Sequence, residues 1–181
     1  MSWLYNYYMK TEIKDPLNIK NEVIHDNPIR VKMFILNEKN EYILIPAFEG
    51  YQLPGGHVEG NEDFKLAVIR EVQEETGIML DENEVPVPFF RIERYSKKSD
   101  GTNRCATIIY YFIKTDKRHD LSKRNLTEHE KENNYSVCLI HKDNVEQELT
   151  KVINTSPNEG SRIVADETLY AFKILKKEIF E

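Results

Sequence analysis

The chain has 181 residues, a formal net charge of −6 and an isoelectric point near 5.5. Apolar residues make up 40% of the sequence and charged residues 31%, which is typical of a globular protein and not of a disordered one. The acidic balance excludes a broad basic face for duplex nucleic acid, and no apolar run approaches the ~20 residues of a membrane span. We expect one domain over residues 1–181, because domains usually have about 100–150 residues.

The N-terminal region carries little pattern. Residues 1–28 are mixed and polar, and we expect them to form either an arm or an edge strand. The first residues lack the basic stretch and apolar core of a signal peptide, so we expect a cytoplasmic protein. Cys105 and Cys138 lie in apolar, strand-like runs, which is typical of buried free thiols and not of a disulfide framework or a zinc site.

Strands are predicted on both sides of a central helix. Apolar runs over 30–37 and 42–46 flank a polar turn at 37–40, which predicts a β-hairpin. Asn61 is a good N-cap and Gly77 a natural helix end, so the sequence predicts a helix between them. The further expected elements are strands at 85–95, 104–114 and 135–140 and helices at 143–153 and 164–180. Because a hairpin is combined with interleaved strands and helices, we expect an α/β fold with a mixed sheet.

The central helix has an unusual arrangement of charge. On a helical wheel its apolar arc is formed by Phe64, Ala67, Val68 and Val72. Glu71 and Glu75 fall inside this arc, and Glu74 lies at its edge. Carboxylates at this spacing repel one another and are costly to bury, so a cation is expected to compensate them. An oxygen-rich cluster suits Mg²⁺ or Mn²⁺, although the wheel alone equally allows an exposed helix with three solvated glutamates.

The residues around this helix follow a fixed spacing. The segment from Gly56 to Ile78 fits the pattern G-x5-E-x7-R-E-U-x-E-E-x-G-U, where U is aliphatic, at every defined position. The defined positions are Gly56, Glu62, Arg70, Glu71, Val72, Glu74, Glu75, Gly77 and Ile78. A chance match somewhere in the chain is on the order of one in a million. The segment resembles the Nudix box, and the resemblance extends over roughly residues 30–153.

The resemblance implies a fold and a metal site. Nudix hydrolases have an α/β/α sandwich with a mixed β-sheet, so the same Nudix-like fold is expected here. By the same resemblance, divalent cations, Mg²⁺ or Mn²⁺, would bind to Glu71, Glu74, Glu75 and the carbonyl of Gly55. Arg70 would belong to the catalytic group by orienting a carboxylate such as Glu62. Such cations polarise phosphoryl oxygens and activate water.

The resemblance is less specific about the base and the substrate. Glu71 is the first candidate for the general base, and Glu128 or Glu130 in a later loop is the second. Arg91, Arg94 and Tyr95 are candidates for substrate binding, although cations on a strand pair are at least as often only solvated. Tyr95 lies eighteen residues after Gly77, a spacing similar to that of dinucleoside polyphosphate hydrolases of the family.

The function implied is hydrolysis of a diphosphate linkage in a nucleoside diphosphate derivative. The partner would be a small nucleotide-type substrate, with no membrane and no duplex nucleic acid, and a homodimer is common among similar proteins. A dinucleoside polyphosphate hydrolase is a narrower alternative, and a non-catalytic nucleotide sensor is an alternative from another class. The complete set of box carboxylates argues against a sensor. An isoprenoid diphosphate isomerase would need a cysteine in its cleft, and an RNA-decapping enzyme would need a basic region.

Overall fold

The computed structural model describes residues 9–47, 49–124 and 136–180. Its centre is a seven-stranded sheet in the order β1-β5-β6-β2-β3-β4, with β7 also paired to β3. The strands are β1 (Lys10–Lys14), β2 (Ile29–Leu36), β3 (Glu41–Ala47), β4 (Gly50–Gln52), β5 (Phe90–Lys97), β6 (Asn103–Lys114) and β7 (Cys138–His141). The helical elements are α1 (Phe64–Thr76), the 3-10 turn η2 (Leu121–Lys123), α3 (Val145–Thr155), α4 (Glu159–Leu175) and the π-helical turn η3 (Lys176–Phe180).

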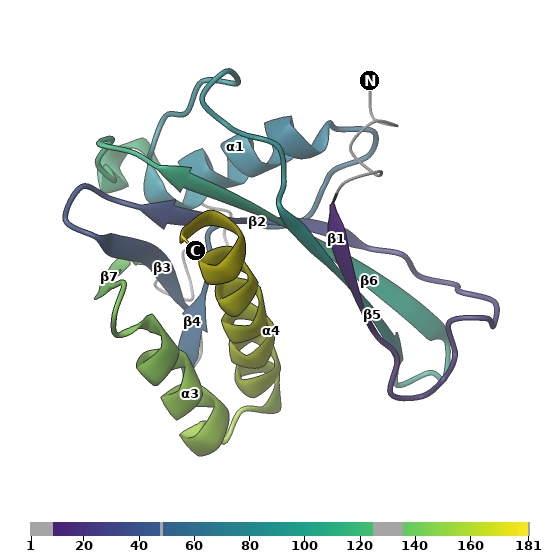
Figure 1. Cartoon of the computed structure of the whole chain (residues 1–181). Coiled ribbons are helices and arrows are strands. Elements are labelled where there is room, and N and C mark those ends of the chain that lie inside the picture. The colour runs from purple at the N-terminus through teal and green to yellow at the C-terminus, as the bar shows by residue number, and fades with distance from the viewer. Residues whose placement is uncertain (1–8, 48, 125–135, 181) are drawn as a thin grey trace.

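The sheet is mixed, which confirms the expectation from the sequence. β2 runs parallel to β6 and β1 parallel to β5, whereas β5 and β6 form an antiparallel hairpin. The helix α1 covers one face of the sheet, and α3 and α4 cover the other (Figure 1). The arrangement is therefore the expected α/β/α sandwich.

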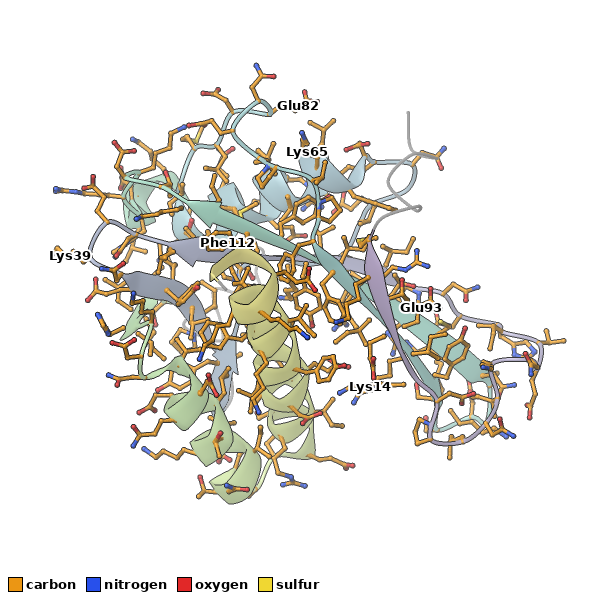
Figure 2. The ribbon with its side chains drawn as sticks, viewed as in Figure 1. Lys14, Lys39, Lys65, Glu82, Glu93 and Phe112 are labelled. Carbon is orange, nitrogen blue, oxygen red and sulfur yellow. The ribbon has the colours of Figure 1, made fainter. Side chains whose placement is uncertain are left out.

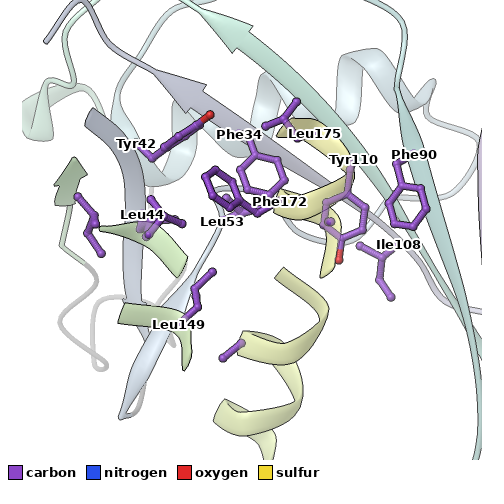
Figure 3. Packing of buried hydrophobic residues seen from close by; sticks show 14 of the residues in the cluster. Phe34, Tyr42, Leu44, Leu53, Phe90, Ile108, Tyr110, Leu149, Phe172 and Leu175 are labelled. Carbon is purple, nitrogen blue, oxygen red and sulfur yellow. The ribbon is translucent and has the colours of Figure 1, made fainter. Parts of the chain in front are cut away.

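Each face of the sheet has its own apolar core. On the α1 face, side chains of β2 and β6 pack against Ala67, Val68 and Val72. On the other face, aromatic rings dominate, and Figure 3 shows Phe34, Tyr42 and Phe172 in contact below the sheet. The period of two along β2 explains this division, because Val31, Met33 and Ile35 face α1 while Phe34 and Leu36 face α4. Both helix layers are thereby fixed to one rigid sheet.

The edge of β2 is divided between two partners, and this division creates the site. Near its end, β2 pairs with β3 through Leu36 and Tyr42. Nearer its start, the loop after β4 takes the place of β3. The N–H groups of Val31 and Met33 donate to the carbonyls of Gly56 and Pro54, both at 2.9 Å. The glycine-rich loop is therefore hydrogen-bonded to the sheet like a strand.

Several element boundaries differ from those predicted. The first turn of α1 is capped by Asp63, whose side chain accepts from Lys65 N, and not by Asn61. The strand expected at 85–95 begins only at Phe90, because Pro86 and Pro88 have no N–H to donate to a ladder. The last helix begins at Glu159, where Asn158 caps it by accepting from Ser161 N.

Of the two alternatives for residues 1–28, an arm or an edge strand, residues 10–14 form the edge strand β1. Across the described part of the chain, no helix has both the length and the apolar character needed to cross a membrane.

Candidate active site

Glu75 joins the box helix to the glycine loop. Its side chain lies on the last turn of α1 and the residue is 2% exposed. The Oε2 atom accepts a hydrogen bond of 2.8 Å from the backbone N–H of Gly55. A buried carboxylate that accepts from a backbone N–H is held in one orientation, because the bond offsets part of its desolvation cost. Glu75 therefore fixes the distance between the helix and the loop.

Glu71 lies directly against the second glycine of the loop. A Cβ built on Gly56 would fall 2.5 Å from Glu71 Oε1, so only glycine lets the carboxylate approach the backbone this closely. Glu71 is 8% exposed, and this burial raises the pKa of its carboxyl group, while the nearby Arg70 acts in the opposite direction. The site thus contains a carboxylate that is costly to ionise without positive charge beside it.

Arg70 supplies part of that positive charge. Its Nε and Nη2 atoms donate to the two carboxylate oxygens of Glu62, both at 3.0 Å, as a bidentate pair. Its Nη1 atom donates both to Glu71 Oε1 at 2.9 Å and to Glu74 Oε2 at 3.0 Å. Nη2 also donates to the carbonyl of His57 at 3.0 Å. One guanidinium group therefore gathers three box carboxylates.

We expect Arg70→Gln to lower the free energy of unfolding by about 2 kcal/mol, because a hydrogen bond to a charged group contributes about 1.5–3 kcal/mol to stability. The three carboxylates would then repel one another without a shared donor. Urea unfolding followed by circular dichroism measures the change. Arg118→Gln, at an exposed arginine, is the control and should change stability by less than about 0.5 kcal/mol. An equal effect of the two substitutions would contradict a stabilising role for the Arg70 network.

Lys32 is a second cation at the site, and the sequence analysis did not single it out. Its Nζ atom donates to the carbonyls of Gly55 and Leu53, the latter at 2.9 Å, and approaches Gln52 Oε1 at 3.4 Å. The only signal in the sequence is a lysine inside the apolar strand between Val31 and Met33. Such a lysine at a half-buried position needs acceptors, and the glycine loop provides them.

The residues present suit a hard cation, although they are not yet arranged around one. Glu71 and Glu74 share the Nη1 atom of Arg70, which marks a place where positive charge is stabilised by two carboxylates. The Gly55 carbonyl is turned toward a cation, the ammonium of Lys32. Among the described residues, no three His, Cys, Asp or Glu side chains lie close enough to hold an ion as they stand. Oxygen donors of this kind are the ligands that Mg²⁺ and Mn²⁺ prefer.

The three expected substrate-binding residues do not come together. Arg94 faces α4, where its Nη1 atom lies 3.1 Å from Glu167 Oε1. Arg91 points to the opposite face of β5, donates to Thr11 Oγ1 at 2.9 Å and forms a 3.0 Å ion pair with Glu93. Tyr95 shares that face, opposite Cys105 on β6. Alternation along one strand therefore separates Arg94 from the other two. The candidate bases Glu128 and Glu130 lie outside the described residues.

The pair of Arg94 and Glu167 is expected to make stability depend on pH. Glu167 is 7% exposed, and burial raises the pKa of its carboxyl group despite Arg94. The folded state therefore favours the protonated acid. Its stabilising contribution is complete below the unfolded pKa of about 4.3 and is lost as pH rises through the folded pKa. Glu167→Gln removes this loss, so its stability relative to wild type should increase from pH 4 to pH 7.

Urea unfolding of both proteins across that range measures the difference. The ion pair with Arg94 forms only while Glu167 is ionised, so its effect is already part of the raised net pKa. The remaining difference between glutamine and the neutral acid is an offset that does not change with pH. A difference that stays flat, or falls as pH rises, would show that Glu167 is not held in its protonated form by burial.

The family model of the NUDIX domain matches residues 26–153. No curated protein matches the chain significantly by sequence. Among solved structures, the ORF135 protein of E. coli is 16% identical, with a TM-score of 0.52, 84% of this chain and 92% of that chain covered. A MutT protein of Bacillus halodurans is 14% identical, with a TM-score of 0.51 and coverages of 79% and 82%.

These two likenesses show a shared fold, whereas the family model covers most of the chain, including the box and the glycine loop. The chain therefore belongs to the Nudix family and is a Nudix hydrolase.

Proposed function

We propose that the protein is a divalent-metal-dependent hydrolase that cleaves the diphosphate linkage of a nucleoside diphosphate derivative. The observation that carries this proposal is the placement of Glu75 and Glu71 against Gly55 and Gly56, with Glu74 joined to Glu71 through Arg70 and with Lys32 on the Gly55 carbonyl. A diphosphate is doubly anionic, so a site that is rich in carboxylates attracts it only when positive charge is added.

The proposed cation ligands are Glu71, Glu74, Glu75 and the carbonyl of Gly55. When bound there, Mg²⁺ or Mn²⁺ would neutralise phosphoryl oxygens and lower the pKa of a bound water. Gly55 and Gly56 leave the loop without side chains, so a phosphoryl group can approach the backbone closely. Arg70 holds the Glu71 and Glu74 carboxylates beside each other, because its guanidinium group is itself anchored by Glu62.

The reaction consumes one water. The oxygen of water bonds to one phosphorus, and the bridging P–O bond breaks so that the bridging oxygen leaves with the other phosphate. One proton of the water is taken up by a carboxylate, and the second stays on the new phosphate group. We propose Glu71 as that carboxylate, because it is buried directly against Gly56, where the diphosphate would approach the loop. Glu128 and Glu130 are the alternatives.

We propose Arg94 as a contact of the substrate beyond the diphosphate, because its charge lies on the same face of the sheet as the side chain of Lys32. Arg91 and Tyr95 lie on the other face, so a single substrate group does not reach all three. Separate substitutions of Arg91 and Arg94 by Gln distinguish them. The variant whose KM rises while kcat is kept identifies the residue that contacts the substrate.

The test is incubation of the purified protein with Mg²⁺ and a panel of nucleotides, with products separated by chromatography. The panel holds nucleoside triphosphates, an oxidised guanine triphosphate, ADP-ribose, NADH, dinucleoside polyphosphates and sugar nucleotides. Cleavage at a diphosphate bond that stops on addition of EDTA is the expected result and gives the substrate class. Nucleotide binding without turnover would favour the sensor, and light scattering of the same sample decides whether the protein is the proposed homodimer.

A further inference from the structure

Lys32 donates a hydrogen bond to the Gly55 carbonyl oxygen, which the proposed function assigns to the metal as a ligand. Its ammonium group donates to the carbonyl of Gly55 and, in the same turn, to the carbonyl of Leu53 at 2.9 Å. Gln52 Oε1 lies at 3.4 Å from the same nitrogen. A lysine ammonium is a compact point charge with three donors, so it can donate to oxygens that would otherwise coordinate a metal ion.

The backbone places Lys32 beside the glycine loop. A Cβ on Gly55 would lie 2.1 Å from the carbonyl oxygen of Val31 and 2.9 Å from the Cα of Lys32, so the loop is pressed against β2. Ladder hydrogen bonds from Val31 and Met33 hold the loop on both sides of Lys32. The side chain of Lys32 therefore starts beside the Gly55 carbonyl, and rotation of its own stem is the way for it to leave.

The charges around Glu71 are balanced by the protein itself. Arg70 Nη1 bridges Glu71 and Glu74, and the positive charge of Lys32 also reaches Glu71, where it favours the ionised carboxylate. A divalent cation entering this site meets two positive groups. Arg70 has Glu62 as a second, bidentate partner and can keep its place, whereas Lys32 donates directly to the Gly55 carbonyl that would be coordinated.

We propose that Lys32 is a positioning residue that acts as the built-in counter-ion of the cation site. It holds the Gly55 carbonyl while no divalent cation is bound and gives up this oxygen when one binds. The inference rests on the proposed function. It has two consequences: the site binds divalent cations more weakly than its carboxylates alone would allow, and the released ammonium lies beside the anionic diphosphate.

The experiment is a titration of the full chain with Mn²⁺, in which electron paramagnetic resonance measures the free ion. Lys32→Gln keeps a donor but removes the charge, and Lys32→Arg keeps the charge. Lys39→Gln, at the tip of the β2–β3 hairpin (Figure 2), removes one exposed charge of the same kind far from the loop. We expect Lys32→Gln to bind Mn²⁺ about tenfold more tightly than wild type, because like charges a few ångströms apart repel. Lys32→Arg and Lys39→Gln should remain within about twofold.

A measurement on the unaltered protein supports the variants. Nitrogen-15 NMR of the lysine ammonium groups, with the Lys32 signal assigned by its loss in Lys32→Arg, should show that this signal moves when Mg²⁺ is added. This NMR measurement remains decisive if circular dichroism shows that Lys32→Gln is unfolded. A Lys32 signal unmoved at saturating Mg²⁺ would overturn the inference, as would equal or weaker Mn²⁺ binding by folded Lys32→Gln. Wild-type protein that binds neither Mn²⁺ nor Mg²⁺ would instead refute the proposed function itself.

Discussion

Replacing Glu75 by glutamine is expected to lower kcat/KM for diphosphate cleavage by at least about 1000-fold. The amide keeps an oxygen that can accept from the Gly55 N–H at the same position, so the loop should stay in place. Only the negative charge is removed, and with it a proposed cation ligand. The measurement is steady-state turnover of the substrate found by the nucleotide panel, together with Mn²⁺ binding by the variant.

Glu82→Gln is the matched control for this substitution. Glu82 is exposed on the loop after α1, near Lys65 on the outer side of the helix (Figure 2), and its replacement should leave kcat/KM unchanged. If Glu75→Gln keeps activity within a few-fold of wild type, Glu75 is not a metal ligand. Its role would then be limited to the hydrogen bond with Gly55.

The largest loss of stability is expected for Gly77→Ala, at about 3 kcal/mol. Gly77 ends α1 with a φ of +72°, which costs an L-residue about 1–2 kcal/mol. A Cβ there would also fall 1.9 Å from the carbonyl oxygen of Asp120, whose N–H donates to Thr76 O at 3.0 Å. Overpacking against backbone adds about 1–3 kcal/mol. Urea unfolding measures the total.

Gly101→Ala separates the two causes. Gly101 has a φ of +84° in the β5–β6 turn, but nothing lies within 4 Å of a Cβ built on it. This variant should lose only about 1 kcal/mol, from the backbone conformation alone. Equal losses for the two alanines would mean that the segment around Asp120 moves aside without cost.

The box helix could be predicted because its signal is local. The apolar residues of α1 recur at helical spacing, and the same wheel placed Glu71 and Glu75 inside the apolar arc, where both are indeed buried. The N-cap of this helix could not be predicted with the same accuracy, since Asn61 and Asp63 belong to residue types that are equally good N-caps. The structure uses Asp63, because the preceding residues form a turn in which Glu62 N–H donates to Glu59 O.

Contacts between distant segments had no such signal. β1 pairs with β5 across about eighty residues, and the polar sequence of Lys10–Lys14 has little to mark it as a strand. The position of Lys32 beside Gly55 depends on the loop replacing β3 along β2, which no periodicity shows. The split of Arg94 from Arg91 and Tyr95 follows from strand alternation, but only once the bounds of β5 are known.

The division of the β2 edge between β3 and the glycine loop also determines how the site opens locally. Loops that carry glycines usually exchange their amide hydrogens quickly, because they open without disturbing the core. Here the loop closes the ladder of a central strand, since the amides of Val31 and Met33 are protected by its carbonyls. Those two amides should exchange with deuterium at the rate of loop opening, while the neighbouring amides of β2 that bond to β6 exchange more slowly. The glycine loop thus opens as an end of the sheet, and each opening also separates the Gly55 N–H from the Glu75 carboxylate.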